Sequence, residues 1–149
     1  MIKLIEELQV NELSIIPTDK GDVLHALKES DDSFFGFGEL YFSEINQGVI
    51  KGWKRHKEMT MNLMVPSGEV KIVVYDGRLA SLTRGIFNKF IISRHKNYQR
   101  LSVPPGVSIA FQGIAKGTSQ VMNFSNIMHD PNEVENIDLD EIKYNWELS

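Results

Sequence analysis

Turn-forming residues break this sequence at short intervals, and that spacing limits what the chain can fold into. The clearest breaks are Pro66-Ser67-Gly68, Asp76-Gly77, Pro104-Pro105-Gly106 and Asp130-Pro131. Between them lie runs rich in β-branched and aromatic residues, and in one run Val70, Ile72 and Val74 share a face of an extended chain. Short strands at this spacing are typical of antiparallel sandwiches and barrels, so we expect an all-β fold. The expected strands are Glu69–Tyr75, Ile86–Ile92, Tyr98–Val103, Val107–Gln112 and Ser119–Asn126.

Weaker, helical signals lie toward the two ends of the chain. Gly21–Ser30 fits either a short helical turn or an early strand. Asn132–Trp146 carries Asn132 and Glu135 at the spacing of a helix cap, followed by acidic residues, which favours a short exposed C-terminal helix. Because the chain has no internal repeat, low-complexity segment or linker, we expect residues 1–149 to form a single domain.

Charge and composition exclude several classes of protein. The formal net charge is -4, and the one basic cluster, Lys51–Lys57, is too short for a nucleic-acid-binding face. The absence of cysteine excludes disulfide frameworks, Cys-ligated zinc and cysteine nucleophiles. Glu6 and Glu7 stand where a signal peptide needs an apolar run, and no stretch approaches the roughly 18 apolar residues of a membrane span. We therefore expect a cytoplasmic protein that binds neither nucleic acid nor membrane.

A series of motifs follows one order between residues 19 and 131. Six segments carry it: Asp19–Gly21 (DKG), Gly48–Trp53 (GVIKGW), Gly68–Arg78 (GEVKIVVYDGR), Ser81–Phe87 (SLTRGIF), Ile92–Gly106 and Val107–Phe111. In this order they are similar to the D-x-R-G, GVLRGLH, GEVFDVAVDLR, SPTFGxW, LSxEN…QLxIPxG and FAHGF segments of the dTDP-4-dehydrorhamnose 3,5-epimerases. The chain therefore resembles that family of the cupin superfamily. The resemblance implies a single cupin-type antiparallel β-barrel, or jelly roll, with the short helical segments at its ends.

The resemblance also implies an activity. Members of the family epimerise carbons beside a keto group: a base removes a proton there, and an acid returns one on the other face. It implies a nucleotide-sugar substrate, a role in bacterial surface polysaccharide biosynthesis, and no cofactor. It further implies a homodimer formed through early segments such as Ile2–Ile16 and Phe34–Phe42.

Four positions depart from the family pattern. Lys54 stands at the position of the base, Ile109 at that of a second His, Met128 at that of an acidic Tyr, and Met61 at that of a Lys. These departures leave two alternatives to the epimerase. One is a nucleotide-sugar 3,4-ketoisomerase, which also moves protons beside a ketone. The other is a catalytically inactive cupin that binds a sugar nucleotide or a partner enzyme.

The candidate catalytic residues are Lys54 and His56, which are two positions apart and so share one face of a strand. If that face lines the interior, His56 can serve as the base, and Lys54 can polarise a carbonyl, hold a diphosphate or act as a base itself. Lys51, where the family has an Arg, is either a contact to the substrate phosphates or an exposed strand lysine. The alternative for Trp53–Lys57 as a whole is a solvated turn.

Further residues are candidate substrate contacts. Trp53 can stack on a nucleotide base or pack against the barrel, and Asn62 can hydrogen-bond a sugar hydroxyl. Asn123 and Asn126 are three apart, so a regular strand turns only one of them inward, and we select Asn126. His129 is either a stand-in for the absent Tyr or a local cap.

A metal-binding cupin would need an H-x-H pair, a Glu and a distant His. At those positions this chain has Lys54 and His56, then Met61, then Ile109. One ligand out of four does not hold a metal ion, so we expect a metal-free site.

Overall fold

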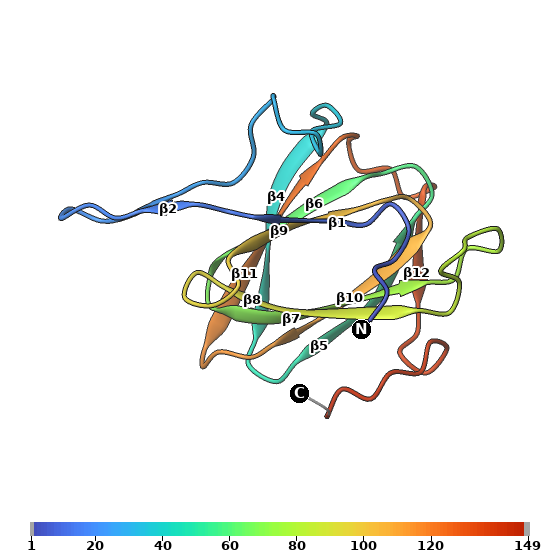
Figure 1. Cartoon of the computed structure of the whole chain (residues 1–149). Coiled ribbons are helices and arrows are strands. Elements are labelled where there is room, and N and C mark those ends of the chain that lie inside the picture. Colours follow the sequence, from blue (N-terminus) through green and yellow to red (C-terminus); the bar gives the residue numbers. More distant parts are fainter. Residues whose placement is uncertain (1, 148–149) are drawn as a thin grey trace.

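Two five-stranded sheets face each other in the computed structural model, which describes residues 2–147 (Figure 1). The first sheet has the order β1-β9-β6-β11-β4, the second has the order β12-β5-β10-β7-β8, and β2 and β3 form a separate pair. All of the strand pairs are antiparallel. The strands are β1 (Gln9–Glu12), β2 (Ile15–Ile16), β3 (Val23–Leu24), β4 (Glu39–Asn46), β5 (Ile50–His56), β6 (Met61–Ser67), β7 (Glu69–Asp76), β8 (Phe87–Ser93), β9 (Gln99–Val103), β10 (Val107–Gly113), β11 (Thr118–Ser125) and β12 (Val134–Ile137).

The all-β prediction is confirmed, and each of the five expected strands forms within one residue of its expected bounds. The alternation in β7 sorts its side chains as expected. Val70, Ile72 and Val74 are fully buried in the core between the sheets, while Val73 belongs to a second cluster on the opposite face. Burial of such aliphatic side chains, at roughly 1.5–3 kcal/mol each, holds the two sheets together.

The second cluster covers the outer face of the sheet that contains β5. Its aromatic members, which we call the outer aromatic cluster, are Trp53, Tyr75, Phe87, Tyr144 and Trp146. The segment after β12 supplies two of them, and its Ile142 carbonyl oxygen accepts a hydrogen bond from Trp53 Nε1 at 3.2 Å. The C-terminal segment thus lies against the back of β5.

The expected C-terminal helix is wrong, and of the two alternatives for Gly21–Ser30 the early strand forms instead of the helical turn. Within residues 2–147 no segment is helical, and none of them could cross a membrane as a helix. Gly21–Ser30 contributes the two-residue strand β3, and Asn132–Trp146 contributes β12. The reason is tertiary: β5 has a free edge, and Val134–Ile137 satisfies its backbone groups by pairing with Trp53–His56.

A buried polar network closes the end of β7. The Asp76 carboxylate, fully buried, accepts hydrogen bonds from Arg78, Ser81 and Thr83. Burial alone would raise the pKa of Asp76, but the hydrogen bonds outweigh burial and hold its pKa far below the usual range. Asp76 therefore has a structural role at this turn.

Candidate active site

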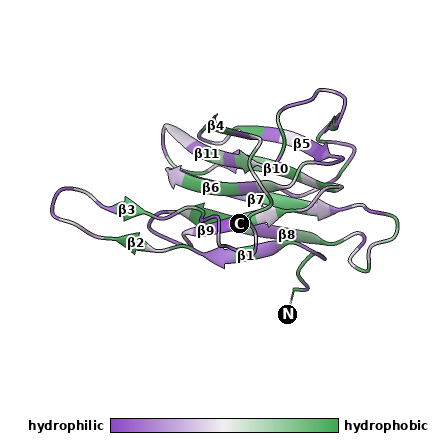
Figure 2. Cartoon of the chain, turned by 90° about the horizontal axis from the view of Figure 1, so that it is seen from above, coloured by the Kyte–Doolittle hydropathy of each residue, from purple (hydrophilic) through white to green (hydrophobic). Residues whose placement is uncertain are grey.

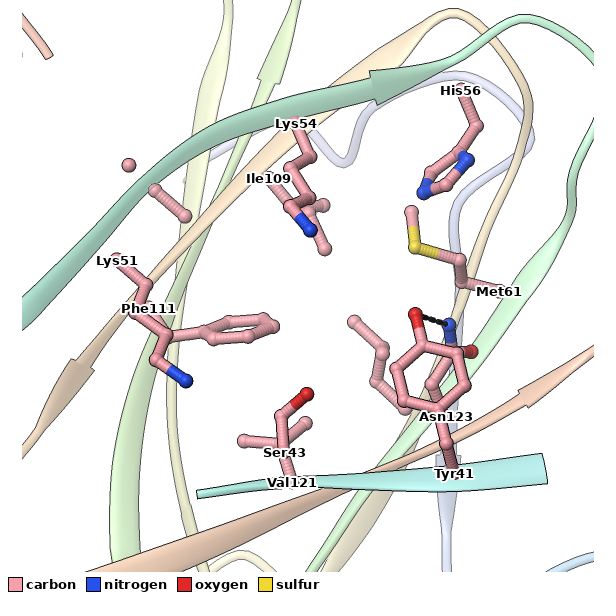
Figure 3. Close-up of a pocket in the computed structure, with 13 residues that line it drawn as sticks. Tyr41, Ser43, Lys51, Lys54, His56, Met61, Ile109, Phe111, Val121 and Asn123 are labelled. Atoms are coloured by element: carbon pink, nitrogen blue, oxygen red, sulfur yellow. Dashed lines mark hydrogen bonds between the residues drawn. The ribbon is translucent and has the colours of Figure 1, made fainter. Parts of the chain in front are cut away.

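A cavity of about 110 Å³ lies between the two sheets (Figure 3). A single water molecule needs roughly 10–15 Å³ by this measure, so the space admits several, and it is too large to be a packing defect. Its polar lining residues are Tyr41, Ser43, Lys51, Lys54, His56 and Asn123, and its larger apolar ones are Met61, Leu63, Ile109, Phe111 and Val121. The mixture of an apolar wall with a few polar groups is typical of a site for a small polar ligand.

Strand β5 supplies three of the polar side chains. Lys54 and His56 both line the cavity, as their two-residue spacing predicts, so the solvated-turn alternative is wrong for them. Lys51 is three residues from Lys54, yet it also faces the cavity. The pairing with β10 shifts between Ile109 and Phe111, and this irregularity places one extra residue on β5.

His56 forms a buried pair with Glu133, a residue that sequence reasoning missed. His56 is 4% exposed and its Nδ1 contacts Glu133 Oε1. The second carboxylate oxygen accepts the backbone N–H groups of Glu58 and Met59 at 3.1 and 3.2 Å. With three donors on one carboxylate, the position of the imidazole ring is fixed.

The surroundings of Glu133 keep it ionised. Burial raises the pKa of its carboxyl, but the hydrogen bonds from His56, Glu58 and Met59 outweigh burial and leave the pKa below its usual value. An ionised Glu133 can only accept a hydrogen bond, so it orients Nδ1 of His56 as the donor. Nε2 is then the ring nitrogen that can take a proton, which is the arrangement of a general base.

The Lys54 side chain extends from β5 into the middle of the cavity (Figure 3). It lies beside Ile109, its cross-strand neighbour on β10. No hydrogen bond or ion pair joins its ammonium group to another residue in the described part of the chain. The site therefore presents a cation to whatever occupies the cavity, on the same wall as His56.

Lys51 bridges the two sheets. Its Nζ donates a hydrogen bond of 2.5 Å to the backbone carbonyl of Glu44 on β4. The side chain is exposed at one end of the cavity, where a negatively charged group from solvent can reach it.

Tyr41 and Asn123 complete the polar lining. Asn123 Nδ2 donates to the Tyr41 hydroxyl oxygen at 2.9 Å, and the two residues are direct cross-strand neighbours on β11 and β4. Tyr41 was missed, although alternation in Glu39–Asn46 (ELYFSEIN) could have found it: Tyr41, Ser43 and Ile45 share the inner face.

Four residues selected from the sequence lie outside the cavity. Trp53 is 1% exposed within the outer aromatic cluster, so of its two expected roles the structure shows packing. Asn62 faces away from the cavity, where it donates to the Ser33 carbonyl and accepts from Ser102. It stabilises a loop rather than meeting a ligand in this cavity.

The remaining two residues, Asn126 and His129, form hydrogen bonds near the ends of strands. Asn126 accepts the backbone N–H of Thr60 at 2.8 Å, and it is Asn123 that turns inward. His129 is exposed on the loop after β11, where its backbone N–H donates to Glu39. Met128 beside it is 71% exposed, and neither side chain lines the cavity.

Within residues 2–147 no three His, Asp or Glu side chains gather in a way that could hold a metal ion. The imidazole of His56 lines the cavity, and it binds the carboxylate of Glu133 behind it.

Fold and site together define a class: a cupin-type protein with a His–Glu pair and an unpaired lysine in a cavity between its sheets. No protein-family model matches the chain. The structure is similar to that of a dTDP sugar isomerase from Desulfovibrio desulfuricans, with a TM-score of 0.92 and 37% identity over 97% of this chain and 94% of the other. The chain therefore belongs to the family of dTDP-sugar isomerases and epimerases, as the motif resemblance indicated.

Two further proteins are also similar to the chain. A probable low-salt glycan biosynthesis epimerase from Haloferax volcanii is 29% identical over 128 residues, which are 85% of this chain and 81% of that protein. A dTDP-6-deoxy-D-glucose-3,5-epimerase from Legionella pneumophila, solved with dTDP-4-keto-L-rhamnose, has a TM-score of 0.85 and 22% identity over 100% of this chain and 83% of the other. At that identity the likeness supports the fold alone.

Proposed function

We propose that this protein is a nucleotide-sugar epimerase that acts on a carbon beside the 4-keto group of a dTDP-linked sugar. The observation that carries the proposal is the His56–Glu133 pair at the wall of a cavity that also receives the free ammonium group of Lys54. The supporting relatives are a dTDP sugar isomerase and a glycan biosynthesis epimerase. The product would serve the biosynthesis of a surface polysaccharide.

In the proposed reaction, Nε2 of His56 takes the proton from the carbon next to the ketone. The electron pair of that C–H bond moves toward the keto oxygen, and an enolate forms. The ammonium group of Lys54 stabilises the negative charge on that oxygen, which is worth most in a cavity with apolar walls. Glu133 stabilises the imidazolium that His56 becomes.

Lys51 is proposed to bind the diphosphate of the substrate. Its ammonium group lies at an exposed end of the cavity, and its present partner is a neutral carbonyl oxygen, that of Glu44. A diphosphate is a stronger partner for an ammonium group than a carbonyl is, so Lys51 can exchange one for the other.

The test is incubation with dTDP-4-keto-6-deoxyglucose in deuterated water, followed by proton NMR. Deuterium at C3 with an inverted centre would indicate a single epimerase, and deuterium at C3 and C5 a double epimerase. Migration of the ketone to C3 would indicate the 3,4-ketoisomerase. If neither deuterium nor product appears, the protein is an inactive binder and the proposal is wrong.

Two pairs of variants assign the residues. His56→Asn should abolish deuterium uptake, whereas His129→Asn, on the exposed loop, should leave it unchanged. Lys54→Met should slow it by about 10²–10³-fold, the usual cost of losing a group that stabilises an oxyanion. Lys57→Met is its control, because Lys57 is exposed and absent from the cavity lining.

We also propose a cytoplasmic homodimer. The β2–β3 hairpin projects from the body of the molecule (Figure 2), and its Ile16 and Val23 are 48% and 51% exposed. On the outer face of β4, Leu40 and Phe42 are also exposed, so a second copy has apolar surface to cover. Sedimentation of a single species at the 17.0 kDa chain mass would contradict the dimer.

A further inference from the structure

We propose that Tyr41 is the acid of this site and delivers a proton to the enolate from the wall opposite His56. The inference rests on the proposed function, because it concerns the second half of the same reaction. It adds a catalytic residue, Tyr41, and a residue that positions it, Asn123.

The first argument is the position of Tyr41. An epimerase has to remove a proton from one face of the sugar ring and return one to the other. His56 stands on β5 in one sheet, and Tyr41 stands on β4 in the facing sheet. Both line the same cavity, and in Figure 3 their side chains extend into it from opposite strands. A ring bound between the sheets therefore has these two groups on its two sides.

The second argument is elimination among the polar lining residues. Lys54 lies on the same strand as His56, so it approaches from the same wall. Lys51 already donates to the Glu44 carbonyl across one end of the cavity. The alcohol of Ser43 is far too weak an acid to protonate carbon, whereas a phenol has an ordinary pKa of about 10. The phenol of Tyr41 is thus the acid that the β4 wall offers.

The third argument is the hydrogen bond to Tyr41. Asn123 Nδ2 donates to the phenol oxygen at 2.9 Å, so the phenol accepts from Asn123 and its own proton stays available to the cavity. The same N–H stabilises the phenolate that remains after the proton has left. Asn123 is 3% exposed, and the Tyr41 hydroxyl is the nearer of the two hydrogen-bond partners of its Nδ2, the other being Met59 Sδ at 4.0 Å.

The step balances without a co-reactant. The Tyr41 O–H bond breaks, and its proton bonds to the enolate carbon on the face away from His56. The enolate electron pair forms the new C–H bond as the C4 carbonyl is restored. Solvent then returns a proton to the Tyr41 phenolate and removes one from the His56 imidazolium, so the net change is inversion at one carbon.

The test separates proton removal from inversion. Tyr41→Phe is incubated with dTDP-4-keto-6-deoxyglucose in deuterated water, and NMR follows two readouts: deuterium in recovered substrate, and epimerised product. With the acid gone, His56 still removes the proton and returns deuterium to the original face. We expect deuterium in the unchanged substrate, with epimer formation reduced at least about 100-fold, at the lower end of general acid contributions.

Matched variants and outcomes make the result decisive. Tyr75→Phe removes a hydroxyl from the outer aromatic cluster and should leave both readouts unchanged. Asn123→Leu should reduce epimer formation more than deuterium exchange. If wild type shows neither readout, the proposed function fails and the inference with it. If wild type is active, two results would refute the inference alone. One is a Tyr41→Phe protein that forms epimer within threefold of the wild-type rate. The other is a folded Tyr41→Phe protein that loses deuterium exchange as completely as it loses inversion.

Discussion

Replacing Glu133 by Gln removes the charge from the His56–Glu133 pair and almost nothing else. The side chain keeps its size, so the buried space around it stays filled. Its remaining oxygen can still accept the backbone N–H of Glu58 or Met59, but it cannot serve those groups and His56 together. Its amide can also donate to His56 Nδ1, which would place the imidazole proton on Nε2, the nitrogen that needs to be free.

The expected loss follows from the charge. When His56 takes a proton, a carboxylate about 4 Å away stabilises the imidazolium by about 4 kcal/mol at an effective dielectric constant of 20. Each 1.36 kcal/mol is a factor of ten in rate, so the rate of deuterium uptake should fall by about a thousandfold. The two backbone N–H groups share a weaker acceptor, which should lower the free energy of unfolding by about 1–3 kcal/mol.

The assay is deuterium uptake at C3 by NMR, with urea unfolding to measure stability separately. Glu135→Gln is the control, because Glu135 lies two residues further on and pairs with Arg55 at the surface. A Glu133→Gln protein that is folded and exchanges deuterium within threefold of wild type would refute the assignment of the pair as the base.

Four other predictions concern stability and the metal-free site. Asp76→Asn should lower the free energy of unfolding by about 1–3 kcal/mol in urea, because the buried carboxylate that accepts hydrogen bonds from Arg78, Ser81 and Thr83 is replaced by an amide with a single acceptor oxygen. The pKa of Asp76 is lower in the folded protein, so wild-type stability should be full above the unfolded pKa near 4 and fall as pH drops below it; a flat acid profile would contradict this. Trp53→Ala should cost about 3–5 kcal/mol, since it empties the centre of the outer aromatic cluster, and should leave the affinity for dTDP, measured by calorimetry, within threefold. Prolonged dialysis against EDTA should leave deuterium uptake unchanged, and a loss restored by a divalent cation would contradict the metal-free site.

The strands could be predicted because their information is local. Alternation along β7 gives the period of that strand, and the turns at Pro66-Ser67-Gly68 and Asp76-Gly77 mark its two ends, all within about ten residues. The C-terminal segment could not be predicted in the same way. Its cap-like residues and acidic run favour a helix locally, but the open edge of β5 offers Val134–Ile137 backbone partners that an isolated helix lacks. Tertiary pairing outweighed propensity there.

The site residues also differ in whether local sequence or only the folded chain reveals them. Lys54 and His56 were found because they are neighbours on one strand, and the period of two settles their shared face. Glu133 is 77 positions from His56, and Asn123 is 82 from Tyr41, so only the folded chain brings these pairs together. Met128, at the position of the family's acidic Tyr, lies on an exposed loop, whereas the phenol that reaches the cavity is that of Tyr41 on β4.

Strand periodicity also explains why Trp53 was a poor choice for a ligand contact. A residue between an inward Lys54 and an extra residue of the bulge has to face outward, and Trp53 does so. There it packs against Tyr75, Phe87 and Trp146 and donates to the Ile142 carbonyl. Because this anchoring fixes the back of β5, it also fixes the direction in which Lys54 and His56 enter the cavity. Of the two roles that the sequence left open for Trp53, packing is the one that supports the strand carrying the proposed base.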